Sequence, residues 1–171
     1  MASNVANIIL ILSIFFSFLS NLFFFKKKIK LSINTFNWSS IFTFTSFLLL
    51  IFYFSSSNFS ISAVYENSHT LKPFFYKLSG TWGNHEGSLL LLILIIGLYG
   101  TLFTIFYNKN ITFKSWVVFF QNNIYLIFLI FLIVKSNPFD LIIPTPEEGL
   151  GLNPILQDPL SVSYTHLTLP T

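Results

Sequence analysis

The sequence predicts an all-α membrane protein, a polytopic helical bundle of about four transmembrane helices with outward-facing loops. Hydrophobic residues make up 53% of the chain and charged residues only 9%, whereas soluble domains carry about a quarter charged residues. Apolar stretches of about 20 residues, enough to cross a bilayer as a helix, recur along the chain. Lipid offers no hydrogen bonds to open backbone groups, so these stretches must be helices.

The four predicted spans cover residues 4–25, 38–57, 88–107 and 116–134. In the first, basic residues follow the apolar stretch, which argues against a cleaved signal peptide. In the third, Gly97 and Gly100 predict close packing against another helix. The fourth contains Gln121, Asn122 and Asn123. Partners for these amides are expected inside the helix bundle of an intact protein, and Gln121 and Asn122 are expected to lack partners in this part alone.

Lysine positions predict the orientation. The run "KKKIK" at residues 26–30 separates the first two spans, and Lys109 and Lys114 separate the last two. Connections rich in lysine face the cytoplasm or the matrix. The N-terminus, the loop 62–87 and the segment 136–160 are then outside, together with all six acidic residues. Lys72, Lys77 and Lys135 oppose this assignment.

The last residues differ in composition from the rest. "SVSYTHLTLPT", 161–171, is rich in Thr and holds neither Phe nor Lys. Residues 162–171 match one reading frame of a common sequencing adapter, so we expect 161–171 to be a non-native tail, with no role for His166. Residues 1–160 are then expected to be the N-terminal transmembrane part of a longer protein; an ordinary polar terminus is the alternative.

The outward segment "GTWGNHEGS" at 80–88 is the first candidate functional motif. Ser88 is predicted to cap the third span. His85 is a candidate ligand to a metal or a porphyrin iron, with Glu86 to orient it. In the competing structural interpretation, Trp82 anchors at the lipid headgroups while His85 and Glu86 hydrogen-bond the loop. No second ligand stands nearby in the sequence, and the absence of Cys excludes disulfides and thiolate metal sites.

The second candidate motif lies in the proline-rich segment "NPFDLIIPTPEEGLGLNPILQDP" at 137–159. Proline at this density favours extended and turn conformations. His69, the "PEEG" acids and Asp158 are expected to be solvated. No catalytic triad, phosphate loop or metal-spaced cluster is present. The candidate outer-loop residues are Gly80, Trp82, Gly83, His85, Glu86, Gly87, Asn153, Pro154, Gln157, Asp158 and Pro159.

Taken together, "TWGNHEGSLLL" and "NPF…LNPILQDP" resemble the CcmF/NrfE family, the haem lyase subunit of cytochrome c maturation. The resemblance covers residues 4–160, and the order and separation of the two motifs also fit the family. Leu92 stands where the family usually has Trp, and Gly151 where it often has an acid.

This resemblance implies a multi-pass protein of the bacterial inner (plasma) membrane with its N-terminus outside; the mitochondrial inner membrane is the alternative. It implies haem as cofactor, and a haem chaperone, apocytochrome c and other cytochrome c maturation subunits as partners, with no nucleic acid. Haem would be attached to apocytochrome c on the outer face. The family's haem-ligand histidines lie beyond residue 160, so this part is expected to be inactive alone. Trp82, His85 and Glu86 are expected to support the haem site, and no catalytic or metal residue is assigned.

Two other functions remain open on the sequence. A polytopic transporter or ion-translocating subunit would carry ionisable residues within its spans, and none stands in the cores of these four. A non-catalytic membrane scaffold would use its outer loops only to bind partners.

Overall fold

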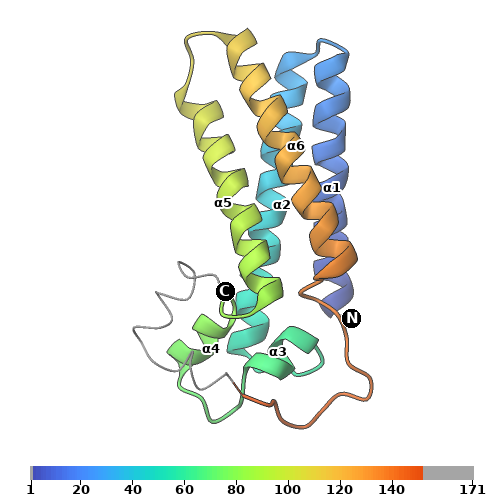
Figure 1. The fold of residues 1–171 in the computed structure, drawn as a ribbon, viewed down its shortest axis with the longest axis vertical. Helices are drawn as coiled ribbons and strands as arrows, with labels where there is room; N and C mark the ends of the chain where they lie inside the picture. The colour runs from blue at the N-terminus through green and yellow to red at the C-terminus, as the bar shows by residue number, and fades with distance from the viewer. Residues whose placement is uncertain (1, 152–171) are drawn as a thin grey trace, which may run out of the picture.

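The computed structural model describes residues 2–151. Within that range the chain forms six helices: α1 (Ala2–Phe25), α2 (Ile29–Ser55), α3 (Ser62–Asn67), α4 (Phe74–Gly80), α5 (His85–Phe106) and α6 (Ile111–Lys135). The helices α1, α2, α5 and α6 run side by side, and α3 and α4 lie across one end (Figure 1). These four long helices are long and apolar enough to cross a membrane, which confirms the predicted fold class.

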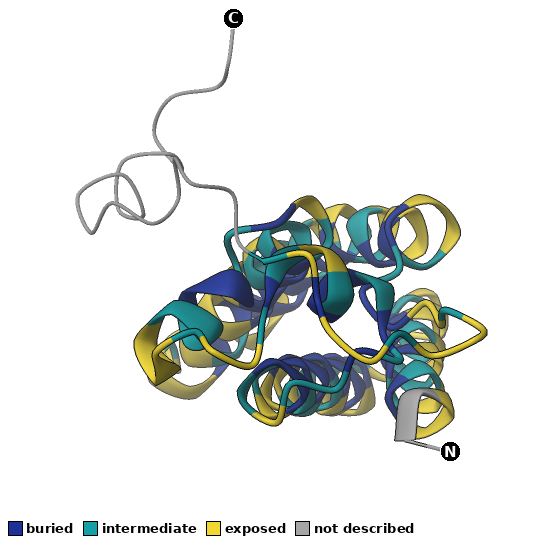
Figure 2. Cartoon of the chain, turned by 90° about the horizontal axis from the view of Figure 1, so that it is seen from below, coloured by how far each residue is buried: buried dark blue, intermediate teal, exposed yellow. Residues whose placement is uncertain are grey.

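The four long helices close into a ring in which α1 packs on α2, α2 on α5, α5 on α6, and α6 back on α1. Seen along the helices, buried positions face the middle and exposed positions face outward (Figure 2). The exposed faces are apolar, as at Phe15, Leu48 and Ile127. Lipid suits such a surface, because it offers apolar groups the environment that a soluble protein reserves for its core.

Much of the bundle interior is polar. Tyr125 of α6 is fully buried, and its hydroxyl contacts Ser13 Oγ at 3.1 Å, the carbonyl of Ser39 at 3.1 Å, and the hydroxyl of Thr43. Small hydroxyl side chains let α1 and α2 approach closely, and Ser13 Oγ bonds across the helix pair to the hydroxyls of Ser39 at 3.0 Å and Thr43 at 2.8 Å. This Tyr125 cluster therefore ties three helices together.

The amides of α6 have partners within this part of the chain. Gln121 Nε2 donates to the Ile96 carbonyl at 2.7 Å. Asn122 accepts from Ser17 Oγ at 2.7 Å and donates to Asn21 Oδ1 at 2.8 Å. The expectation that Gln121 and Asn122 lack partners in this part alone is therefore wrong, because α1 and α5 already supply oxygen atoms at the right height.

The two glycines of α5 bring it close to its neighbours, as predicted. A Cβ on Gly97 would lie 2.8 Å from Ser40 Oγ, and a Cβ on Gly100 would lie 2.6 Å from the ring of Phe36. Both contacts are with α2. A side chain larger than hydrogen at either position would push α5 away from α2.

All four long helices begin before the predicted spans, and the difference is largest for the second. The second helix begins at Ile29, nine residues before the apolar stretch that starts at 38, and so carries Lys30, Asn34 and Asn37. The chain turns into it through Lys27, whose φ of 57° lies in the left-handed region. The bond from Lys28 N to the Phe23 carbonyl, 2.9 Å, completes a tight C-terminal cap on α1. The α1–α2 and α5–α6 connections lie at the same end of the bundle, here named the lysine end (Figure 1).

Candidate functional site: the cap at the end opposite the lysines

The opposite end of the bundle carries a folded cap, here defined as residues 56–84 and 136–151. It contains α3, α4 and the chain that follows α6 (Figure 1). Two segments far apart in sequence are joined in it. Ile61 and Leu141 form an isolated antiparallel bridge, with bonds from Ser62 N to the Asp140 carbonyl and from Ile142 N to the Ser60 carbonyl. The first motif region and the described part of the second, residues 137–151, therefore lie at one end, within one folded unit.

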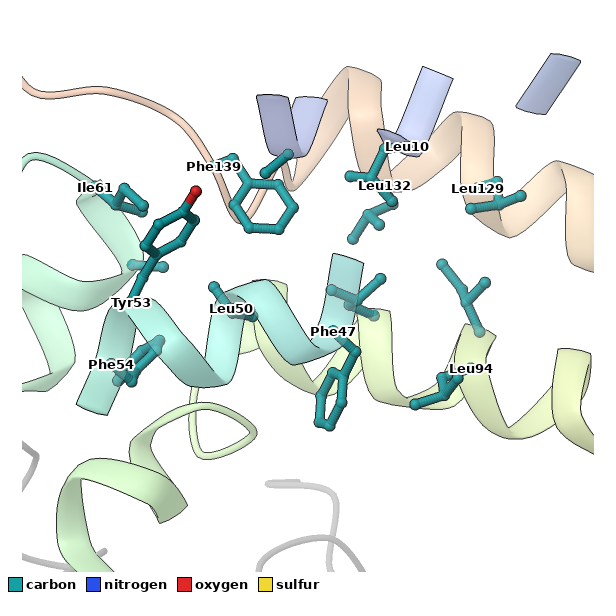
Figure 3. Close-up of a cluster of buried hydrophobic side chains, with 14 of the residues drawn as sticks. Leu10, Phe47, Leu50, Tyr53, Phe54, Ile61, Leu94, Leu129, Leu132 and Phe139 are labelled. Carbon is teal, nitrogen blue, oxygen red and sulfur yellow. The ribbon is translucent and has the colours of Figure 1, made fainter. Parts of the chain in front are cut away.

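Apolar side chains anchor the cap on the helices. Phe139 is fully buried and meets Tyr53 of α2 edge to face, with 6.2 Å between the ring centres. Figure 3 shows Phe139 reaching from the chain after α6 toward Tyr53 and the α6 residue Leu132. Ile61 and Phe54 are also fully buried. Burial of such side chains stabilises by roughly 1.5–3 kcal/mol each, so the cap is held firmly.

A second set of contacts fastens the end of the described chain. Glu148 accepts hydrogen bonds from the Thr70 backbone N–H at 2.9 Å and the Thr70 hydroxyl at 2.6 Å. The two bonds from Thr70, with His69 nearby, hold the pKa of the Glu148 carboxyl below its usual value. Leu150 N donates to the Tyr65 carbonyl at 2.8 Å. Glu148 and His69, expected to be simply solvated, thus also join the two cap segments.

The motif "GTWGNHEGS" forms the junction between α4 and α5. Asn84 is buried and caps α5: its Oδ1 accepts from Gly87 N at 2.6 Å, and its Nδ2 donates to the Gly80 carbonyl at 2.6 Å. The prediction that Ser88 is the N-cap is wrong, because α5 already begins at His85. Ser88 instead bonds back to the His85 carbonyl at 3.0 Å.

Two glycines of this motif, Gly80 and Gly87, are needed for space. A Cβ on Gly87 would lie 1.7 Å from the Thr81 carbonyl oxygen, so no other residue fits the observed backbone. A Cβ on Gly80 would lie 3.0 Å from the ring of Phe54. Trp82 is half-buried and packs against the hydrophobic core. These three residues and Asn84 therefore build the junction that sets the start of α5.

His85 and Glu86 occupy the first turn of α5, on the side left free by the junction. His85 is exposed. Glu86 is half-buried and lines a small polar cavity of about 90 Å³ with Glu66, Lys135 and Asp140. An acid in the first turn is favoured by the helix dipole. The motif thus presents one imidazole and one carboxylate on a rigid frame.

Among residues 2–151, no three His, Cys, Asp or Glu side chains are grouped to hold a metal ion. The polar cavity at Glu86 has room for a few waters, well below the roughly 300–1,000 Å³ of typical ligand pockets. The larger apolar cavity beside Trp116, about 400 Å³, lies at the lysine end and has no histidine in its lining. Asn153, Pro154, Gln157, Asp158 and Pro159 lie outside the described residues, as does the expected tail 161–171.

Some buried polar residues were not predicted from the sequence, although their spacing could have indicated them. Ser13, Ser17 and Ser20 recur at helical spacing on α1, and this spacing marks a polar packing face. Lys114, expected in a connecting loop, is instead in the first turn of α6 and buried. Nothing in the sequence near Lys114 indicates its burial, which depends on how α5 ends.

Fold and site define a polytopic helical membrane protein with a structured cap at one end. No family model matches the chain. It is 45% identical over 115 residues to the cytochrome c-type biogenesis protein CycK of Rhizobium meliloti, which covers 66% of this chain and 17% of that protein. NrfE of Haemophilus influenzae is 37% identical over 138 residues, covering 78% and 22%. CcmF of Escherichia coli is 37% identical over 116 residues, covering 67% and 18%.

The chain is therefore a homologue of the CycK, NrfE and CcmF cytochrome c-type biogenesis proteins, as the motifs predicted. It spans less than a quarter of the length of these curated relatives. Its fold matches a solved protein called cytochrome c haem lyase CcmF, with a TM-score of 0.75 and 22% identity over 82% of this chain and 25% of that one.

Proposed function

We propose that the chain acts in cytochrome c maturation, and that its cap helps to position haem or apocytochrome c. This proposal is supported by the homology to cytochrome c-type biogenesis proteins, for example the 45% identity to CycK of Rhizobium meliloti. The whole activity of those proteins resides in chains several times longer, so covalent haem attachment is proposed for the system and not for these residues alone.

In this proposal the motif at the start of α5 supports the site and does not perform bond-forming chemistry. Exposed His85 and half-buried Glu86 stand on a junction in which Asn84 and Gly87 leave little freedom. A fixed, solvent-facing imidazole suits docking of a partner or the edge of a haem. The small cavity at Glu86, about 90 Å³, cannot enclose a porphyrin.

The proposed location is the bacterial inner membrane, with the cap and the N-terminus on the outer side. Support comes from charge. All five acidic residues of the described range, Glu66, Glu86, Asp140, Glu147 and Glu148, belong to the cap or the adjoining turn of α5, while six lysines lie at the lysine end. Lysine-rich connections stay on the cytoplasmic side. The proposed partners are a haem chaperone and other maturation subunits.

The test replaces the homologous segment of Rhizobium meliloti CycK by residues 2–151 of this chain, in cells lacking their own copy. Covalent haem in c-type cytochromes is then measured by haem staining, with immunoblots for the amount of chimera. A working chimera is expected, and His85→Ala in it should lower holocytochrome yield severalfold at unchanged protein level. The matched control is Lys109→Ala, an exposed substitution at the other end.

Two results would contradict parts of this proposal. A chimera that is made at normal level but supports no holocytochrome would argue that this chain has lost the function of its homologues. Normal holocytochrome yield at normal protein level in His85→Ala would indicate that the cap serves only as a structural scaffold.

A further inference from the structure

A second site lies at the lysine end, between α2 and the α5–α6 turn. A cavity of about 300 Å³ there, named the lysine-end pocket, is lined by Lys30, Asn34, Asn37, Thr104, Ile111 and Lys114, among others. Lys30, Asn34 and Asn37 are spaced i, i+4, i+7 and so share one face of α2. On this face Asn37 Oδ1 accepts from Thr104 Oγ1 at 3.1 Å and so joins α2 to α5, whereas Lys30 and Asn34 are exposed.

Lys114 is the centre of this pocket. Its side chain is 9% exposed, although lysine is almost never buried without a partner. Its Nζ donates to the Thr104 carbonyl at 2.8 Å and to Asn108 Oδ1 at 3.0 Å. An ammonium has three N–H donors, so two are used and both acceptors are neutral.

Within the described residues, no acidic side chain lies near enough to Lys114 to balance this charge. The five carboxylates within residues 2–151 are all at the cap end, a bundle length away. The carbonyls that end α5 carry the negative end of its dipole and offset part of the cost. Lys30 on the facing helix adds a second positive charge to the same cavity. The pocket therefore suits an anion from outside the described chain.

The position of the pocket indicates the source of that anion. Lys30 and Lys114 stand in the first turns of α2 and α6, and Thr104 in the last turn of α5. Thr104 and Lys114 lie at the ends of the apolar stretches of α5 and α6, and Lys30 lies farther out, before the apolar stretch of α2 that starts at residue 38. Trp38 and Trp116, both about half exposed and near the same ends, fit the aromatic belt at headgroup level. Basic pockets between transmembrane helices on the cytoplasmic side bind anionic lipid headgroups.

We propose that the lysine-end pocket binds the phosphate of an anionic phospholipid from the adjoining leaflet, with Lys114 and Lys30 as its charged contacts. The amide Nδ2 groups of Asn34 and Asn37 offer neutral hydrogen bonds to the same headgroup, while the Thr104 hydroxyl is bonded to Asn37 Oδ1. This site is separate from the cap and does not depend on the function proposed above.

The test uses the full chain in phosphatidylcholine vesicles with spin-labelled phosphatidylglycerol or phosphatidylcholine. The protein is expected to immobilise the anionic label preferentially. Lys30→Gln and Lys114→Gln should each lower this preference about fivefold, the usual effect of one lysine near an anionic lipid surface. Lys114→Arg should retain it. Lys109→Gln, the same charge change at an exposed position on the same turn, should leave it unchanged.

Two controls keep the proposal open to refutation. Lys30 is exposed, so Lys30→Gln tests the pocket even if Lys114→Gln does not fold. An equal loss in Lys109→Gln would show only diffuse attraction to the lipid surface. No preference in the unchanged chain would show that it does not select anionic lipid. Either result would overturn the site. Inorganic phosphate that abolishes the preference, where chloride at equal ionic strength does not, would identify free phosphate as the ligand and overturn the lipid assignment.

Discussion

Asn84 and Gly87 are joined by a 2.6 Å hydrogen bond from the Gly87 backbone N–H to the Asn84 side-chain oxygen, and this bond sets where α5 begins. The Nδ2 of the same side chain donates to the carbonyl of Gly80, the last residue of α4. One buried side chain therefore connects two helices and fixes His85 and Glu86 in the first turn of α5.

Asn84→Ala should lower the stability of the chain by about 1–2 kcal/mol, because the N-cap is lost and buried backbone groups lose their partners. Thermal unfolding in detergent micelles measures the change. Ser88→Ala, which would remove the cap predicted from sequence, should change stability by less than about 0.5 kcal/mol. If Ser88→Ala were the more destabilising of the two variants, Ser88 and not Asn84 would act as the N-cap of α5.

Gly87→Ala should be more damaging than Gly83→Ala. The added methyl on Gly87 would meet the Thr81 carbonyl oxygen at 1.7 Å, and relief of that contact requires movement of the α4–α5 junction. Overpacking of this kind costs typically about 1–3 kcal/mol. Gly83 does not adopt a left-handed φ, so alanine is compatible with its backbone. Equal unfolding temperatures for the two variants would contradict the junction geometry.

Tyr125→Phe should lower stability by about 0.6 kcal/mol, the average for hydrogen bonds between membrane helices, and by no more than about 1.7 kcal/mol, the largest such value. The hydroxyl it removes contacts α1 and α2 through Ser13 and Ser39. The matched control is Tyr99→Phe, since Tyr99 is 70% exposed on the outside of the bundle. Denaturation of both variants in the same detergent gives the comparison, and identical curves would argue against the Tyr125 cluster.

The contact between Glu148 and Thr70 should depend on pH. Its hydrogen bonds lower the carboxyl pKa in the folded chain below the ordinary value of 4.5. A lowered folded pKa means that this stabilisation is present above about 4.5 and is lost as pH falls through the folded value. Glu148→Gln should thus destabilise the cap at neutral pH and have no effect in strong acid.

Limited proteolysis of the cap, compared between wild type and Glu148→Gln at each pH, measures this dependence. Glu147→Gln, the adjacent acid, serves as the control and should behave as wild type at every pH. A difference that persists below the folded pKa would assign the effect of Glu148 to packing and not to its charge.

Four helices and the separation of charge between the two ends could be predicted from the sequence. Hydropathy and lysine placement are properties of single segments in contact with a bilayer, so they need no knowledge of neighbouring helices. The glycines of α5 were predicted as a packing face for the same reason, since their spacing is local. The family resemblance likewise rested on short contiguous motifs.

Partners that lie far apart in the chain could not be predicted in this way. Asn122 pairs with Ser17 across 105 residues, and Thr70 with Glu148 across 78. The burial of Lys114 and the start of α5 at His85 depend on where neighbouring helices end. Hydropathy measures the preference of each segment for lipid or water, whereas these contacts arise only when helices and cap pack against one another.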